Sequence, residues 1–148
     1  MPAGFMNAFD GLSHFSFCGW VYPTNLSGTT WGTFFTNYAS FGNWNRATFH
    51  QLPNSYGGGA DDILISISNV GAYGEAWTTS NVLELNKWVH LAVVYDGTAA
   101  DNAGKIKIYV NGKPETLSFP SGTNFPATIA ADANTSYIGR YHNPDYFK

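Results

Sequence analysis

The segment around Asn111 and Gly112 constrains the fold of this chain more than any other. Residues 105–110, KIKIYV, alternate strictly between lysine or tyrosine and aliphatic residues. In an extended chain the aliphatic side chains therefore share one face and the lysines share the other. Asn111 and Gly112 follow directly, and this dipeptide supplies the two positive-φ residues of a tight hairpin turn. The segment predicts a β-hairpin with one buried face, which other strands have to cover.

Short strand-like segments recur along the rest of the chain, separated by Gly, Asn, Ser, Thr and Pro. They are residues 15–22 (FSFCGWVY), 31–38 (WGTFFTNY), 63–68 (ILISIS), 75–79 (EAWTT), 88–95 (WVHLAVVY), 115–119 and 136–141 (SYIGRY). No helical pattern of useful length interrupts them, and aromatic residues make up 17% of the sequence against 11% charged residues. The pattern predicts an all-β chain, a two-sheet antiparallel sandwich in a single domain.

The alternation also predicts which residues are buried. The shared core is expected to hold Val89, Leu91, Val93, Ile106, Ile108 and Val110, with residues 63, 65 and 67 on one face. Segments 15–22 and 88–95 are apolar on both faces, although a two-layer sandwich buries only one face of each sheet. We therefore expect either that loops cover the second face or that this face forms part of a binding surface. We expect Cys18, Trp20 and Trp88 to be buried, as such residues commonly are.

Four ordered blocks of sequence resemble one known family. They are FSF with GWVYP in residues 15–23, KWVHLAVVYD in 87–96, IKIYVNGK in 106–113 and YIGR in 137–140. Each block is short, but their order and spacing together are similar to the laminin G-like family of concanavalin A-like jelly rolls. The resemblance implies a jelly-roll sandwich and a role in binding.

The resemblance also implies how the domain is bounded. Members of the family carry a further strand before the first block and another after the last. Residues 1–148 are therefore expected to be a single laminin G-like domain that is a fragment of a longer chain. Segment 15–22 would then have an open backbone edge or pair with a strand from a neighbouring subunit. Both a homo-oligomer and a strand-complementing partner chain fit this expectation.

Several classes of function lack the residues that they need. The formal net charge is −3 and no Lys/Arg cluster occurs, so the basic stripe of a nucleic-acid-binding protein is missing. No apolar run reaches the length of a membrane span. Related glycoside hydrolases carry paired acidic residues on one strand face, whereas the acidic residues here are isolated or adjacent. The sequence predicts a protein that is not an enzyme.

Aromatic residues in polar segments are the strongest sign of a binding function. Sugars stack their CH groups on exposed rings, while Asn and Arg side chains bind the hydroxyls. The candidate ligand-binding residues are Trp31, Trp44, Asn45, Arg46, Trp77 and Tyr141. Calcium is a further candidate, because many relatives hold Ca²⁺ through loop carboxylates. The loop residues here are Asp61, Asp62, Asp96, Asp101, Asn102 and Asp132, which form no spaced ligand motif.

These observations predict a non-catalytic carbohydrate-binding or adhesion module. It would belong to a larger extracellular, cell-surface or viral appendage protein, with a glycan or another protein surface as its partner. The alternative is a structural assembly domain, a component of a virion or filament, that has no small ligand.

Overall fold

The computed structural model describes residues 9–27, 31–37, 46–52, 59, 61–131 and 136–139. These residues form ten strands and one short helix, α1 (Asn102–Lys105). The strands are β1 (His14–Val21), β2 (Gly32–Asn37), β3 (Arg46–Gln51), β4 (Ile63–Asn69), β5 (Ala72–Thr78), β6 (Val89–Asp96), β7 (Ile106–Val110), β8 (Lys113–Pro114), β9 (Leu117–Ser118) and β10 (Ser136–Ile138).

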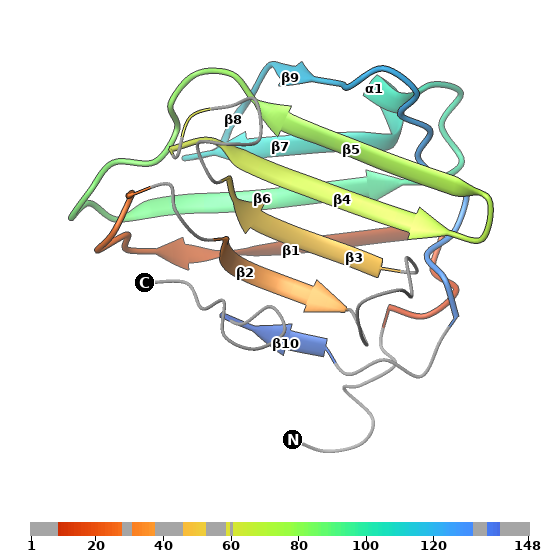
Figure 1. Ribbon diagram of the computed structural model, residues 1–148, viewed down its shortest axis with the longest axis horizontal. Coiled ribbons are helices and arrows are strands. Elements are labelled where there is room, and N and C mark those ends of the chain that lie inside the picture. Colours follow the sequence, from red (N-terminus) through yellow and green to blue (C-terminus); the bar gives the residue numbers. More distant parts are fainter. Residues whose placement is uncertain are drawn as a thin grey trace.

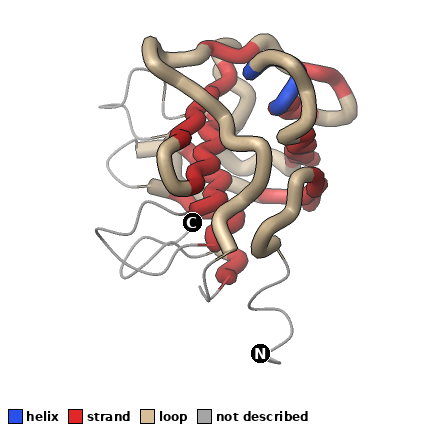
Figure 2. The backbone as a smooth tube through the Cα atoms, turned by 90° about the vertical axis from the view of Figure 1, so that its right-hand side faces the viewer, coloured by secondary structure: helices blue, strands red, loops and turns tan. Residues whose placement is uncertain are grey.

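The strands form two antiparallel sheets that stack face to face. A four-stranded sheet has the order β1-β6-β7-β8, and a six-stranded sheet has the order β10-β2-β3-β4-β5-β9. Figure 1 looks onto the six-stranded sheet with the other sheet behind it, and Figure 2 shows the two layers from the side. The prediction of an all-β, two-sheet antiparallel sandwich is confirmed. In the described part of the chain no helix is long enough to cross a membrane, since α1 has four residues.

The core lies between the sheets and contains the residues that alternation predicts. All six expected core residues of β6 and β7 are buried, and Lys107 between them is exposed. Aromatic rings join the two sheets: Phe17 of β1 lies 5.2 Å from Phe35 of β2 and 6.4 Å from Phe49 of β3, measured between ring centroids. These ring contacts fix how the two sheets pack against each other.

The predicted hairpin is present, but its return strand is divided between the two sheets. Asn111 and Gly112 have φ values of 49° and 78°, as the tight turn requires. After the turn, β8 pairs with β7 for two residues, and β9 then pairs with β5 in the opposite sheet. One strand, β3, lies where no strand was expected, between β2 and β4.

The first strand lies at the edge of its sheet. β1 pairs with β6 over eight residues, from His14 opposite Asp96 to Val21 opposite Val89. Among the strands that the structure describes, no other pairs with β1. The expectation of an open backbone edge along this strand is therefore confirmed for the described residues.

Candidate functional site

The largest exposed aromatic side chains lie together on the outer face of the four-stranded sheet. Trp20 is 64% exposed and Trp88 is 65% exposed, with Tyr22 at 39%. Side chains alternate across a strand, so Phe15 and Phe17 of β1 point into the core while Trp20 points outward. We call Trp20, Tyr22, Trp88 and His90 the aromatic cluster.

The register of β1 and β6 positions the aromatic cluster. Trp20 lies directly opposite His90, and their rings make an edge contact with centroids 5.3 Å apart. The Tyr22 and Trp88 rings are also 5.3 Å apart and inclined by 55°. Asn111 in the hairpin turn holds His90, because its Oδ1 accepts a hydrogen bond from the His90 N–H at 3.0 Å. Two rigid strands and a turn therefore fix the cluster.

The sequence-based expectation for three of these side chains was wrong. Trp20, Trp88 and Cys18 were expected to be buried, but all three are exposed. Alternation gives β1 and β6 one face toward the core and one face away from it. The described loops do not cover the second face, so its apolar side chains meet solvent. Of the two alternatives expected for this second face, cover by loops is not seen in the described residues, and a binding surface stays a prediction.

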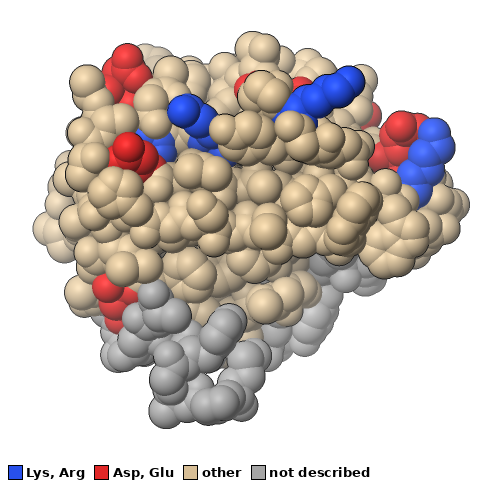
Figure 3. Space-filling view, turned by 180° about the vertical axis from the view of Figure 1, so that it is seen from behind, with Lys and Arg blue, Asp and Glu red and all other residues tan. Residues whose placement is uncertain are grey.

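The surface around the aromatic cluster carries little charge. Figure 3 views this side of the molecule, and its centre contains no Lys, Arg, Asp or Glu. At the end of the sheet that carries Trp88, the adjacent Lys87 donates through its Nζ to Glu84 Oε2, an ion pair between two exposed side chains. Near the other end, the Thr98 hydroxyl and N–H donate to Asp96 and hold the pKa of that carboxyl below its ordinary value of 3.8. A ligand of this face would meet neutral groups first.

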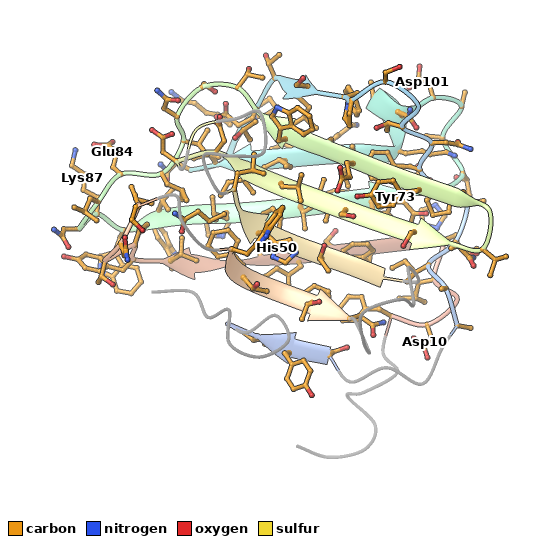
Figure 4. The ribbon with its side chains drawn as sticks, in the orientation of Figure 1. Asp10, His50, Tyr73, Glu84, Lys87 and Asp101 are labelled. Atoms are coloured by element: carbon orange, nitrogen blue, oxygen red, sulfur yellow. The ribbon has the colours of Figure 1, made fainter. Side chains whose placement is uncertain are left out.

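The outer face of the six-stranded sheet is polar and buried. Thr36, Thr48, Ser66 and Glu75 stand opposite one another across β2 to β5, and each is at most 4% exposed. The Thr36 and Thr48 hydroxyls make no hydrogen bond within the described structure. Glu75 accepts a hydrogen bond from the Tyr73 hydroxyl, which Figure 4 labels on this sheet. Because these groups are shielded from solvent, a ligand reaches this face less readily than it reaches the aromatic cluster.

Two of the six sequence-predicted binding residues lie over this polar face. Trp31 precedes β2, and its ring contacts the ring of His50 at 5.3 Å between centroids. His50 lies opposite Leu64, which lies opposite Trp77, so one cross-strand row joins the two tryptophans. Both tryptophans are half-buried.

The other four predicted residues lie, entirely or in their side chains, outside the described structure. The backbone of Arg46 begins β3 opposite Ser68, but its side chain is outside the described structure. Trp44, Asn45 and Tyr141 also lie outside the described residues. The aromatic cluster was missed as a site because burial of apolar strand residues is the commoner outcome. Its signal was the second apolar face of segments 15–22 and 88–95.

The candidate calcium ligands serve the local structure of their loops. Asp62 is buried and accepts hydrogen bonds from Thr78 Oγ1 at 2.9 Å and from the Asn81 N–H at 3.2 Å. Asp101 caps α1 by accepting from a backbone N–H at 2.7 Å. Within the described ranges, no three His, Cys, Asp or Glu side chains gather as a metal site would require. Calcium binding stays a prediction, and Asp132 lies outside the described residues.

A groove opens beside the edge strand, between β1 and β10. It has a volume of about 430 Å³. Side chains from both sheets line its floor and walls, among them Phe17, Val21, Phe34, Phe49, Leu91 and Ile138. We call it the edge groove. Its lining is almost entirely apolar, and Trp20, Tyr22 and Trp88 of the aromatic cluster border it.

Comparison with solved structures finds the same fold in two other proteins. The carbohydrate-binding module of the Ruminococcus gnavus sialidase, bound to α2,3-sialyllactose, matches with a TM-score of 0.59 and 12% identity, over 93% of this chain and 69% of that one. A heptameric pentraxin of Limulus polyphemus matches with a TM-score of 0.55 and 18% identity, over 94% of this chain and 57% of that one. These similarities show the fold alone.

Comparison at the level of sequence places the chain in a family. No curated protein matches it. A family model described as the concanavalin A-like lectin/glucanases superfamily, of laminin G type, matches residues 5–148. The match covers almost the whole sequence and includes all four of the blocks that carry the resemblance. The chain therefore belongs to the concanavalin A-like lectin/glucanase superfamily.

Proposed function

We propose that this chain is a non-catalytic carbohydrate-binding module of a larger extracellular, cell-surface or viral appendage protein. The observation that carries the proposal is the aromatic cluster, two exposed tryptophans held on a rigid sheet. Sugar rings present CH groups that stack on such faces, and the exposed Asn111 offers an amide beside them. The solved carbohydrate-binding module of the same fold supports this class of ligand.

The surroundings of the cluster favour a neutral glycan. Lys87, next to Trp88, is paired with Glu84, and the centre of this face shows no Lys or Arg, so a strongly anionic glycan would lose hydration and gain little counter-charge. Binding would rest on stacking and neutral hydrogen bonds, with no bond made or broken. Among the described carboxylates, Glu75 and Asp62 are buried and engaged by hydroxyl groups, which does not suit a pair that flanks a glycosidic bond.

The proposal predicts that the exposed tryptophans bind glycan and contribute little to stability. Replacing Trp20 or Trp88 by Ala should lower retention on a neutral-polysaccharide affinity gel by about fivefold or more, because each stacking contact contributes about 1 kcal/mol or more. The melting temperature should hardly change, since a ring at the surface adds little to the core. Adding EDTA to the same gel tests whether calcium, which the family resemblance predicts, takes part.

Two control variants separate this face from the rest of the molecule. Val70→Ala removes an apolar side chain that is 87% exposed and lies in the turn between β4 and β5, away from the cluster. It should leave retention unchanged. Trp77→Ala alters the six-stranded sheet, where the sequence-predicted binding residues Trp31 and Trp77 lie. Lost retention in Trp77→Ala with normal retention in Trp20→Ala and Trp88→Ala would contradict the proposal and return the site to that sheet.

The open edge of β1 favours a second candidate function, an assembly domain. An unpaired edge can join a strand of another chain without any small ligand. An absence of glycan binding together with defined association would favour this candidate.

A further inference from the structure

The backbone of β1 has hydrogen-bonding groups that no described strand uses. The Gly97 N–H donates to the Ser13 carbonyl at 2.7 Å, which fixes the phase of the antiparallel ladder between β1 and β6. In such a ladder alternate residues bond to the neighbour and the others turn their N–H and C=O groups away. The backbone groups of Ser16, Cys18 and Trp20 therefore face the open edge.

This edge lacks the devices that normally prevent strand pairing. Natural edge strands are blunted by lysine, proline, a β-bulge or short length. Residues His14–Val21 include no Lys, Arg, Asp, Glu or Pro, and their register with β6 is unbroken over eight pairs. The edge is thus long, regular and uncharged.

The edge groove beside this strand has room for side chains. Gly19 interrupts the aromatic residues of β1, and a Cβ atom built on it would meet no atom within 4 Å. A glycine inside a strand often marks a place where another backbone approaches closely. On the far wall, Ile138 of β10 is 61% exposed. Open space and exposed apolar surface therefore lie next to the unpaired backbone groups.

The backbone partial charges of the edge and the lack of charged side chains in the groove determine what kind of segment can bind there. The edge presents alternating partial charges, N–H and C=O, which another extended backbone complements. None of the described residues that line the groove is Lys, Arg, Asp or Glu. A charged side chain placed there would lose its hydration without a partner, which is costly. The matching segment is apolar at the positions that point into the groove.

We infer that β1 and the edge groove form a docking site for an extended β-strand of a partner polypeptide, apolar at every second residue. The strand pairs antiparallel with β1, continues the four-stranded sheet, and places its inward side chains in the groove. A second copy pairing through its own β1 matches the edge but leaves the groove empty. The groove stays empty because Phe15 and Phe17 of that second copy already pack in the copy's own core.

Synthetic peptides test this inference directly. The probe is the end-blocked peptide Lys-Thr-Val-Thr-Val-Thr-Val-Thr-Lys, labelled for fluorescence anisotropy. Residues opposite each other in an antiparallel pair share a face, so the threonines of the docked peptide bond to Ser16, Cys18 and Trp20 while the valines enter the groove. We expect saturable binding. The same peptide N-methylated at its threonines should not bind, whereas N-methylation at its valines should be tolerated.

Variants at Gly19 test the groove independently of the backbone edge. Gly19→Leu fills the open space with a side chain of the protein itself and should weaken peptide binding by about tenfold or more. Gly19→Ala, the matched control, fills less space and should weaken binding less. Trp20, Tyr22 and Trp88 of the aromatic cluster also border the edge groove. The N-methylated peptide pair, used with the wild-type protein, alters no residue of the cluster and therefore separates the two functions. The failure of one function is thus distinguishable from the failure of the other.

Three outcomes would overturn the inference. The first is no peptide binding by the wild-type protein, and the second is equal binding of the two N-methylated peptides. The third is a stable dimer that the peptide does not dissociate, which would make a second copy the occupant. If Gly19→Leu does not fold, the N-methylated pair with the wild-type protein still decides the matter.

Discussion

At the scale of single residues, Tyr95 is a buried ionisable group whose environment affects stability. Its side chain is 1% exposed, and its hydroxyl donates to the Pro126 carbonyl at 2.6 Å. Burial, and then the nearby charge of Asp96, raise the pKa of Tyr95 from 10.0 to about 12. The folded state thus holds the phenolic proton more tightly than the unfolded chain does.

This difference predicts a loss of stability in alkali. The contribution is complete below pH 10.0, the ordinary pKa, and disappears as the pH rises toward about 12. Its size is on the order of 2 kcal/mol. Urea unfolding at a series of pH values should show a steeper alkaline decline in the wild type than in Tyr95→Phe. Parallel pH dependences of the two free energies of unfolding would contradict this assignment.

Individual side chains also show how far the sequence determines the site. Alternation correctly separates Phe17, which is directed inward, from Trp20, which is directed outward. It does not reveal whether another layer covers the outward face, because cover depends on segments distant in the sequence. The choice of Trp31 and Trp77 relied on their polar neighbours. Folding instead placed both rings over a buried sheet face, where they are half-buried.

At the scale of strands, those with strong periodicity were predictable and β3 was not. β4 and β7 alternate aliphatic residues with others, and both form as expected. The sequence of β3 is RATFHQ, in which only Ala47 and Phe49 are apolar and point toward the core. Its outward Thr48 and His50 are buried although polar. Two apolar residues are too few to indicate a strand without the neighbouring strands β2 and β4.

Two strand glycines make a matched prediction about packing. A Cβ atom on Gly74 of β5 would lie 2.3 Å from Phe125 Cγ and 2.7 Å from Phe125 Cα, and Phe125 is fully buried. Gly74→Ala should therefore destabilise the protein by about 2 kcal/mol or more, through overpacking. Gly19→Ala, in open space, should be neutral or slightly stabilising, because alanine restricts the unfolded chain. Urea denaturation of both variants measures the difference, and equal stabilities would contradict it.

At the scale of the whole molecule, the two sheets differ in what they present to solvent. The six-stranded sheet has a polar outer face whose side chains are buried, and the four-stranded sheet has an apolar outer face whose side chains are exposed. Exposed apolar area of this kind usually marks a surface that binds something. The aromatic cluster and the open edge of β1 lie on the same sheet, so ligand binding and association are both concentrated there.

Because the aromatic cluster and the open edge of β1 lie on one sheet, we predict that the isolated chain self-associates weakly when no partner strand is present. An unpaired, uncharged edge next to exposed tryptophans can pair transiently with copies of itself, even though such pairing leaves the edge groove empty. Sedimentation velocity under reducing conditions should show association that increases with protein concentration. Reducing conditions are needed because Cys18, the single cysteine, is exposed on this strand and could form an intermolecular disulfide.

A charge on the edge strand should suppress this association. Cys18→Lys places an ammonium group at the middle of β1, where a paired copy would bring two like charges together. The control is Val70→Lys, which adds the same charge at an exposed apolar position in the turn between β4 and β5. We expect a monomer for the first variant and wild-type association for the second. A wild-type protein that stays monomeric at the highest concentration reached would mean that the edge of β1 is closed to other chains. Equal association of the two variants would instead place the contact away from β1.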